Sequence, residues 1–445
     1  MRFEGLKTAV VGMAQSGIAA TEFLAARGAR VRAIDARPLA ELKDAAEALR
    51  RAGAEFCLQS PAAFEGVELI VVSPGVPYDL PELEQARRRG IPVLGEVELA
   101  AKFLHGENIG ITGSNGKTTT TSLAGHILRE SGVPVQVGGN IGKPVTAMVA
   151  SSRPGQWNVI ELSSFQLETI VHFRAHISVC VNVTPDHLDR HGSFDNYTNA
   201  KARLFETQDP NDFAVLNADD PTCEAFAERT CAKPVMFSTK RPLETGLYAD
   251  AGRVFLDGEP FLAIEDIPLR GRHNVENVLA ASAAAYLAGV PAKAIAAAVK
   301  TFPGVEHRLE FVRNLSGVDF YNDSKATNVD ATMKAIDAFP GRLWIILGGK
   351  DKGSDYTVLR EPLAAKAHAA LLIGKAAPKI ASHLGDAVRL IDAGTLAEAI
   401  RLAYAEATPG DTVLLAPACA SFDQFDNFEH RGRVFKSLVA SLEPK

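Results

Sequence analysis

The sequence predicts an α/β protein of three domains, each built on a largely parallel sheet, and three observations favour this fold class. The chain has 445 residues, which is more than one hydrophobic core can accommodate, because a domain usually has about 150 residues. Apolar runs rich in Val, Ile and Leu alternate with segments of helical period, which is typical of parallel strands joined by helices. Polar loops follow several of these runs, at the strand ends where such sheets bind ligands.

The first domain is predicted over residues 1–95 as a Rossmann-like parallel sheet. Its expected strands are residues 7–12, 29–35, 68–73 and 91–94, with helices that include residues 16–27 and 81–90. Continuous apolar runs such as ELIVVS predict strands that are buried on both faces.

The central domain is predicted over residues 96–303 as an ATPase domain of the phosphate-loop type. It opens with a helix at residues 96–103. The expected strands are residues 109–112, 157–164, 176–184 and 212–218, before a β-rich stretch at 247–269 and two helices at 274–289 and 291–301.

The third domain is predicted over residues 304–445, after Phe302-Pro303-Gly304, and is again Rossmann-like. The alternation of strands and helices restarts there. Strands are expected at residues 319–323, 342–349, 368–374, 387–392 and 411–418.

Composition excludes several classes of protein. The net charge is −6, from 47 Lys and Arg against 53 Asp and Glu, so the chain lacks the basic footprint of a nucleic-acid binder. The longest uncharged stretch, residues 277–292, is shorter than the ~20 apolar residues that a membrane span needs. The five cysteines have no metal-ligand spacing, and no signal peptide is recognisable, so we expect reduced thiols and a cytoplasmic protein.

The segment IGITGSNGKTTTTS, residues 109–122, is the strongest local signal. An apolar strand runs into a glycine loop whose backbone N–H groups can face phosphate oxygens, and Lys117 adds a positive charge. Ile111 stands where the eight-residue phosphate-loop pattern has glycine, and an ordinary glycine turn is the alternative. The residues expected to contact ATP here are Gly113, Ser114, Asn115, Gly116, Lys117, Thr118 and Thr119.

Oxygen ligands for Mg²⁺ can be placed around this loop. Thr118 follows Lys117, and Glu161 ends a predicted strand, so both could reach a metal that also holds the phosphates. His187, in NVTPDHLDRH, could hold a second Mg²⁺, although a lone histidine is often a structural hydrogen bonder. Lys201 lies in a helical segment, where a solvated surface lysine is the simplest interpretation.

A nucleotide site is predicted at the first strand-to-helix turn. Residues 11–17 resemble a dinucleotide fingerprint, but its middle glycine is Ala14, which disfavours NAD. A diphosphate at the helix N-terminus, with Asp35 and Arg37 on the rest of a nucleotide, remains plausible. A tight turn capped by Ser16 is the alternative. Ser16, Ser73 and Gly75 would border the same crevice.

Three polar loops follow strands of the third domain, at residues 321–328, 348–353 and 418–422. Each alone could be a capped turn between a strand and a helix. Because the carboxyl ends of parallel strands share one edge of a sheet, we expect the three loops to converge on a ligand site.

Together these motifs resemble the Mur ligases. The matching segments occur in order along the whole chain: GSNGKTT, VGGNIG, ELSSFQLE, NVTPDHLDRH, GRHNVENVLAA, EHR, NDSKATN and PACASFDQF. The resemblance implies an ATP-dependent amide ligase of peptidoglycan precursor synthesis with three domains. Within the family it is closest to the branch that adds D-glutamate to UDP-N-acetylmuramoyl-L-alanine through an acyl phosphate.

The resemblance also implies roles for individual residues. Lys117, His187 and Lys201 would be catalytic, with Lys201 carbamylated so that it becomes a ligand of one of two Mg²⁺ ions. The other implied contacts are Asn274, Asn277, Arg308, Asp323 and Lys325 for ATP; Asp35, Arg37, Asn140 and His187 for the UDP-linked substrate; and Arg308, Thr327, Lys352, Ser421 and Phe428 for D-glutamate. The roles of Lys350 and Phe422 stay open.

The expected partners are three small molecules: ATP, D-glutamate and UDP-N-acetylmuramoyl-L-alanine. We expect a monomer that binds no nucleic acid and does not insert into membranes. The rival functions are a Mur ligase that adds L-alanine or a diamino acid, a folylpolyglutamate synthase, and a nucleotide-binding protein without catalytic activity.

Overall fold

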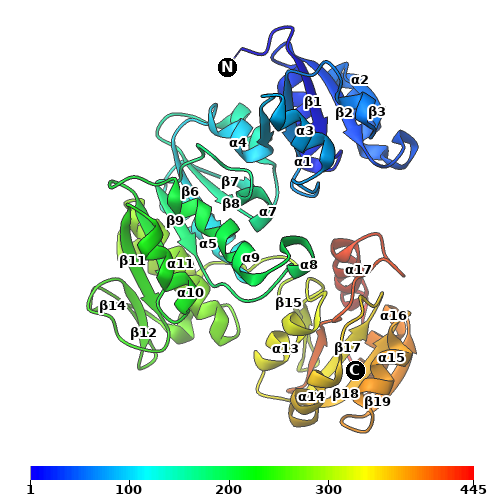
Figure 1. The fold of residues 1–445 in the computed structure, drawn as a ribbon. Coiled ribbons are helices and arrows are strands. Elements are labelled where there is room, and N and C mark those ends of the chain that lie inside the picture. Colours follow the sequence, from blue (N-terminus) through cyan, green and yellow to red (C-terminus); the bar gives the residue numbers. More distant parts are fainter. Residues whose placement is uncertain (1) are drawn as a thin grey trace. The chain divides into compact units, whose positions relative to one another are not determined.

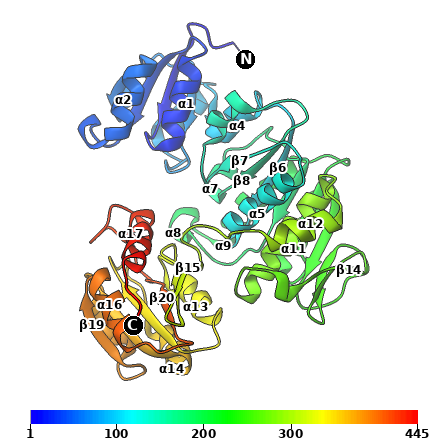
Figure 2. The same ribbon diagram turned by 180° about the vertical axis from the view of Figure 1, so that it is seen from behind.

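A computed structural model describes residues 2–445 of the chain. The chain forms two compact units, one of Met1–Asp266 with Glu276–Phe302 and one of Ile267–Val275 with Pro303–Lys445. Three sheets are present, two in the first unit and one in the second, as the predicted fold class requires (Figures 1 and 2).

The first sheet has five parallel strands in the order β3-β2-β1-β4-β5. The strand order reverses between β1 and β4, which opens a crevice at their carboxyl ends. Four strands were predicted; β3 was not, because its four residues are only partly buried and form no apolar run. The elements are β1 (Lys7–Val11), α1 (Gln15–Ala25), β2 (Arg30–Asp35), α2 (Lys43–Ala52), β3 (Glu55–Leu58), β4 (Leu69–Val72), α3 (Pro81–Arg88) and β5 (Val93–Gly95).

The second sheet has nine strands in the order β14-β13-β12-β11-β10-β9-β6-β8-β7. It is parallel from β7 to β12, and β12, β13 and β14 form antiparallel hairpins at one edge. Its strands are β6 (Glu107–Thr112), β7 (Val135–Gly139), β8 (Trp157–Glu161), β9 (Ile177–Cys180), β10 (Phe213–Asn217), β11 (Lys233–Ser238), β12 (Leu247–Asp250), β13 (Arg253–Leu256) and β14 (Glu259–Ala263).

Strands β7 and β11 of this sheet were not predicted. β7 ends in two glycines and β11 begins with the exposed Lys233 and Pro234, so neither forms a continuous apolar run. The helices of this part are α4 (Glu96–Ala101), α5 (Lys117–Glu130), α6 (Val145–Met148), α7 (Ser164–Leu167), α8 (Leu188–His191), α9 (Phe194–Glu206), α10 (Pro221–Glu224), α11 (Arg272–Leu287) and α12 (Ala292–Lys300).

The first two sheets share one hydrophobic core. Phe3, which precedes β1, and Phe23 of α1 pack against Phe103, which follows α4. The same cluster of buried residues extends to Leu162 and Phe173 beside the second sheet. Burial of one such side chain contributes about 1.5–3 kcal/mol, so this shared core fixes the first sheet against the second.

The third sheet has six strands in the order β15-β16-β20-β17-β18-β19. Five are parallel, and β15, which was not predicted, forms an antiparallel hairpin with β16. The elements are β15 (Glu310–Leu315), β16 (Val318–Asn322), α13 (Val329–Asp337), β17 (Leu343–Gly348), α14 (Arg360–Lys366), β18 (Ala367–Ile373), α15 (Ala377–Leu384), β19 (Leu390–Gly394), α16 (Leu396–Glu406), β20 (Thr412–Leu415) and α17 (Phe428–Ala440). The strands are buried between two hydrophobic clusters, one on each face.

Across residues 2–445, none of the helices combines the length and apolar character that a membrane crossing needs.

Candidate active site

The predicted phosphate loop is a tight turn between β6 and α5. Gly113 has a φ of +147° and Gly116 a φ of +84°, both in the region that favours glycine. A Cβ at Gly116 would lie 2.1 Å from the Asn277 side-chain oxygen. The first turn of α5 therefore presents backbone N–H groups at a surface that a larger residue would obstruct.

Other segments hold the loop in place. The Ser114 hydroxyl donates to the Thr184 carbonyl over 2.8 Å and lies 2.9 Å from the Tyr197 hydroxyl. The Asn115 N–H donates to the Asn182 side-chain oxygen over 2.8 Å. These contacts fix the loop before any ligand binds, which lowers the cost of ordering it around phosphates.

Two lysines meet at this loop. Lys117 Nζ donates to the carbonyls of Gly113 and Ser114 over 2.8 and 2.9 Å. Lys201 Nζ donates to the same Gly113 carbonyl over 2.8 Å, from helix α9. Lys201 is only 1% exposed, so it is not the solvated surface lysine that its helical context favoured.

Burial changes the chemistry of Lys201. Desolvation, and after it the positive charge of Lys117, lower the pKa of the Lys201 amine to about 7. Near neutral pH a large share of this amine is therefore uncharged, which is the form that can act as a nucleophile.

Glu161 has a carboxylate oxygen suited to a cation. It ends β8 beside β6, and its Oε1 accepts a hydrogen bond from the Asn140 side chain over 2.7 Å. Glu161 Oε2 is buried and has no hydrogen-bond partner among the described residues. An unpaired, buried carboxylate oxygen is costly, and a hard cation such as Mg²⁺ would satisfy it. Within residues 2–445, no three His, Cys, Asp or Glu side chains form a metal site by themselves.

His187 stands at the start of α8 in a strained conformation. Its φ is +52°, and its side chain is about half exposed (51%). Its ring packs against Phe165, with 5.0 Å between ring centroids, and its Nε2 lies 3.7 Å from Asp186 Oδ2. Strain of this kind persists only where the surrounding contacts fix it, and it often marks functional positions.

A cavity of about 730 Å³ lies at the carboxyl ends of β1, β2 and β4. Six of the seven residues predicted for the UDP-linked substrate line it, and His187 does not: the lining six are Ser16, Asp35, Arg37, Ser73, Gly75 and Asn140. Gln59 and Gln166 also line it and were not predicted. Gln166 forms a capping box with Ser163. The S-x-x-Q spacing within ELSSFQLE is a sequence signal for this capped turn, but it does not indicate that Gln166 lines the cavity.

The geometry of the first turn explains how Ala14 is tolerated. The close approach of helix and strand occurs at Gly17, where a Cβ would lie 1.8 Å from the Gly12 carbonyl oxygen. Asp35 accepts the Met13 N–H over 2.7 Å and the Arg37 N–H over 2.9 Å. Burial by itself raises the pKa of Asp35, but these hydrogen bonds and the Arg37 side chain hold it below its usual value. Asp35 is therefore ionised and fixes the turn.

The three polar loops of the third sheet converge, as predicted. They follow β16, β20 and β17, which are neighbours in the sheet. The Ala418 N–H donates to the Ala326 carbonyl over 2.9 Å, and the Lys350 N–H donates to the Ala420 carbonyl over 2.8 Å. The loops therefore form one rim.

Arg431, which was not predicted, holds this rim together. It is fully buried in α17, and its guanidinium donates to the Ser324 carbonyl over 2.8 Å and to the Cys419 carbonyl over 3.2 Å. Burial lowers the pKa of Arg431 to about 10, so the group stays charged. No motif marks Arg431, because its role comes from packing and not from spacing.

The residues predicted for ATP and D-glutamate in this unit differ in exposure. Asp323 and Ser421 are buried, whereas Lys352 is exposed. Burial raises the pKa of Asp323 to about 7, against the opposing effects of Arg308 and the Leu309 N–H. Lys325 Nζ lies 3.8 Å from the Phe428 ring centroid, a cation–π distance.

The remaining residues predicted to contact D-glutamate or ATP are Thr327, Asn274 and Asn277. Thr327 lies in the loop after β16, where its N–H donates to the Lys325 carbonyl over 2.7 Å. Asn274 and Asn277 share helix α11 but fall in different compact units.

A network of hydroxyl, thiol and carboxylate groups links two loops of the rim. The Tyr356 hydroxyl donates to Asp351 Oδ1 over 2.7 Å and lies 3.0 Å from Cys419 Sγ. Lys379 donates to Asp351 Oδ2 over 2.8 Å. The loop that carries Lys352 is thereby joined to the loop that carries Ser421.

Comparison with known proteins settles the family. The Mur ligase middle domain matches residues 111–285, the Mur ligase glutamate ligase domain matches residues 307–419, and the Mur ligase MurD-like N-terminal domain matches residues 6–95. The chain belongs to the Mur ligase family. Mur ligases are ATP-dependent enzymes of peptidoglycan precursor synthesis and use Mg²⁺, as the resemblance of the motifs implied.

This Mur ligase is similar to curated relatives over its whole length. It is 64% identical over 445 residues to the UDP-N-acetylmuramoylalanine--D-glutamate ligase of Solibacter usitatus (strain Ellin6076), covering 100% of both chains. A protein of the same name from Acidobacterium capsulatum is 54% identical over 447 residues, covering 99% of this chain and 97% of that protein. The three-domain fold is similar to that of UDP-N-acetylmuramate-alanine ligase from Thermotoga maritima, with a TM-score of 0.63, 19% identity, and 98% and 99% of the two chains covered.

Proposed function

We propose that this Mur ligase joins D-glutamate to UDP-N-acetylmuramoyl-L-alanine, driven by the hydrolysis of ATP to ADP and phosphate. The observation that carries the acceptor is the full-length identity of 64% with a relative named for this reaction. The buried Lys201 amine at the phosphate loop, and the cavity at the crevice of the first sheet, support the chemistry.

The nucleotide-linked substrate would bind in the cavity of the first sheet. Arg37 and the ionised Asp35 would hold the uracil. Ser16, Ser73 and Gly75 would contact the part of the nucleotide that lies in the crevice. Asn140 would direct the alanyl carboxylate toward the phosphate loop, because its side chain already bonds the neighbouring Glu161.

ATP would bind with its phosphates against residues 113–119. Lys117 would leave the Gly113 and Ser114 carbonyls and pair with the phosphates, a stronger, charge-assisted interaction. In the other unit, Asn274, Arg308, Asp323 and Lys325 would hold the remaining parts of the nucleotide. Asn277 would contact the phosphates from beside Gly116.

Two Mg²⁺ ions would neutralise charge on the transferring phosphoryl group and the acyl oxygens. Thr118 and Glu161 would hold the first ion, consistent with the unpaired Glu161 oxygen. His187 and Lys201 would hold the second. Lys201 would do so as a carbamate: its neutral amine adds CO₂ and loses a proton, which converts a cation into a carboxylate ligand.

Amide formation follows phosphorylation of the alanyl carboxylate. The D-glutamate amine attacks the acyl phosphate, phosphate leaves, and the amine loses a proton. A dicarboxylate substrate needs cationic and hydroxyl donors, and Arg308, Lys352, Thr327 and Ser421 would supply them, with Phe428 beside them.

An amino-acid panel tests the acceptor. Phosphate release is measured with UDP-N-acetylmuramoyl-L-alanine, ATP and each amino acid, and D-glutamate should give the highest kcat/KM. Preference for a diamino acid, or for L-alanine with the substrate that lacks alanine, would refute the assignment. ATP binding without turnover for any acceptor would instead indicate a silent nucleotide-binding protein. We also propose that the enzyme works as a monomer in the cytoplasm, where ATP is available.

A further inference from the structure

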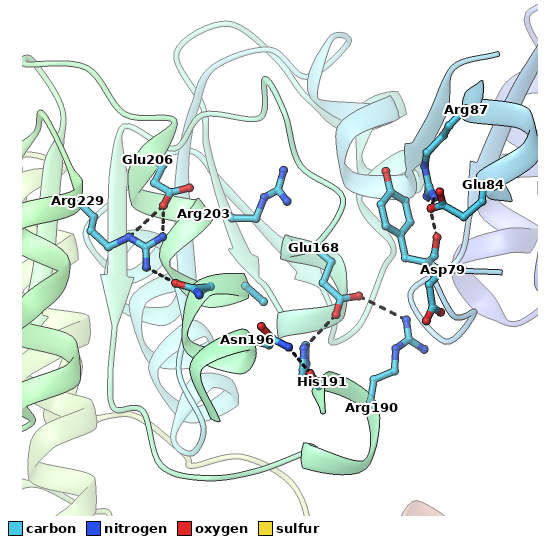
Figure 3. Close-up of a pocket in the computed structure, with 13 residues that line it drawn as sticks. Asp79, Glu84, Arg87, Glu168, Arg190, His191, Asn196, Arg203, Glu206 and Arg229 are labelled. Carbon is cyan, nitrogen blue, oxygen red and sulfur yellow. Dashed lines mark hydrogen bonds and ion pairs between the residues drawn. The ribbon is translucent and has the colours of Figure 1, made fainter. Parts of the chain in front are cut away.

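A second cavity, of about 770 Å³, lies between the loop after β4, helix α3 and helices α7 to α9 (Figure 3). Its lining includes four arginines and four carboxylates: Arg87, Arg190, Arg203 and Arg229 with Asp79, Glu84, Glu168 and Glu206. The charges balance, and three of the arginines pair with carboxylates of the same cavity. Such a lining has no excess charge to attract an anionic ligand. Each of the three ion pairs joins residues of the same part of the unit, Arg87 with Glu84 in α3 and the other two beside the second sheet.

Arg190 has the most consequential contacts in this cavity. Its Nη2 donates to the Val76 carbonyl over 2.9 Å, and Val76 is part of the lining of the substrate cavity at the first sheet. The same nitrogen lies 3.4 Å from Glu168 Oε2. Figure 3 draws this ion pair as a dashed line between the two side chains. Arg190 therefore joins the wall of the substrate cavity to the second sheet's part of the unit.

Arg190 is also one helical turn from His187. The His187 carbonyl accepts the N–H groups of Arg190 and His191 over 3.1 and 3.0 Å, so the backbone of α8 connects the two side chains directly. The Phe165 ring packs against His187 and stacks on His191 at 5.4 Å, and the Arg190 guanidinium lies 5.1 Å from its centroid. A shift of Arg190 would therefore move His187.

The contacts continue from α8 to the phosphate loop. His191 bonds Glu168 over 3.0 Å, and its ring meets the Tyr197 ring edge-on at 5.3 Å. The Tyr197 hydroxyl lies 2.9 Å from Ser114 Oγ, and Lys201 Nζ lies 4.5 Å from the Tyr197 ring centroid. Successive contacts between side chains therefore connect the substrate cavity to the loop expected to bind ATP.

We propose that Arg190 is a positioning residue that couples the two nucleotide sites, because it ties the Val76 wall of the substrate cavity to the helix that begins at His187. This role rests on the proposed function, in which the two cavities hold the UDP-linked substrate and ATP. A ligand in the substrate cavity would order Val76 and, through it, Arg190. Less free energy would then be needed to order His187 when ATP binds, and the same holds in the opposite direction. Coupling of this kind is reciprocal: each ligand raises the affinity for the other by the same factor.

Calorimetry measures the coupling without turnover. The dissociation constant of UDP-N-acetylmuramoyl-L-alanine is determined with and without a saturating Mg²⁺ complex of a non-hydrolysable ATP analogue. The wild-type ratio should be about 10, and Arg190→Ala should lower it to below about 2. Arg190→Lys, which keeps the charge opposite Glu168, should retain an intermediate ratio. In steady-state kinetics Arg190→Ala should also lower kcat and raise the Mg²⁺ concentration needed for half-maximal rate.

Arg229→Ala is the matched control, since it removes the same charge from the same cavity but contacts Glu206 and Asn199 instead. It should keep the wild-type ratio. The role of Arg190 is refuted if Arg190→Ala also keeps that ratio, or if the wild-type ratio is 1. Thermal unfolding would show whether Arg190→Ala has lost its fold. In that case the ratio of dissociation constants measured for Arg190→Lys tests the role. A wild-type enzyme that shows coupling but prefers another amino acid would overturn the proposed acceptor and leave this role intact.

Discussion

Lys117 and Lys201 donate to one and the same oxygen, with each Nζ lying 2.8 Å from the Gly113 carbonyl. Lys201 is buried, and desolvation followed by the positive charge of Lys117 lowers the pKa of its amine to about 7. Lys117, at the start of α5, is therefore suited to pairing with phosphates, and Lys201, in α9, is suited to reaction with CO₂.

The titration of Lys201 gives a pH-dependent modification. Its pKa in the folded protein is lowered to about 7, so the amine is largely neutral at pH 8 and largely protonated at pH 6. Only the neutral amine adds CO₂, so the carbamate and the ligase activity should both fall as pH decreases from 8 to 6. Carbon-13 NMR with labelled bicarbonate should show the carbamate in the wild type. Lys201→Arg stays protonated and should show none; an equal signal in that variant would contradict the assignment.

Removal of the Lys201 side chain should be repairable. Lys201→Ala should lose activity, because one ligand of the proposed second Mg²⁺ is gone. Formate or acetate can enter the vacated space and supply a carboxylate, so these ions should restore part of the rate in a saturable way. Chloride at equal ionic strength is the control. An enzyme that is unaffected by the substitution would rule out a role for the carbamate.

Lys117→Ala should abolish turnover and leave the fold intact. Lys117 is partly exposed, and the Gly113 carbonyl that it contacts keeps its hydrogen bond from Lys201, so we expect the fold to persist without the Lys117 side chain. Its charge supports phosphoryl transfer, and we expect kcat to fall by roughly 10³-fold or more. Phosphate release and thermal unfolding measure the two effects, and full activity in the variant would remove the phosphate-loop assignment.

Gly116→Ala should weaken ATP binding. The residue needs a positive φ, and a Cβ would lie 2.1 Å from the Asn277 side chain, so both the loop and α11 must shift. Gly132→Ala is the control at the other end of α5: its φ is +75° but its Cβ would meet open space. Each variant should lose about 1–2 kcal/mol of stability from the backbone strain. Only Gly116→Ala should raise the dissociation constant for ATP, and equal affinities in the two variants would contradict the contact.

Tyr356→Phe should affect the amino-acid substrate. The lost hydroxyl joins the Lys352 loop to the Cys419 loop, so the KM for D-glutamate should rise several-fold while the KM for ATP stays unchanged. The free energy of unfolding should fall by about 1 kcal/mol. Tyr404→Phe, which loses a hydroxyl bonded to Ser316 away from the rim, is the control and should leave both KM values unchanged. A rise in KM in both variants would show a general loss of stability.

The sequence alone was sufficient to place the main strands along the chain and to locate the polar loops that follow them. Strands buried on both faces, such as β4 and β17, form continuous apolar runs that can be recognised without neighbours. β3, β7, β11 and β15 were not recognised, because they are edge or half-exposed strands whose pairing depends on partners distant in the chain. The domain boundaries at 95 and 303 and the individual site residues stay predictions.

What the sequence determined by itself is local: the glycine loop that precedes Lys117, the polar ends of strands, and the motif order that identifies the Mur ligase family. Only the tertiary structure decided that Lys201 is buried against Gly113, that Arg431 joins two loops, and that Arg190 reaches Val76. The physical reason is that turn geometry follows from neighbouring residues, whereas desolvation and side-chain partners depend on which distant segments pack together.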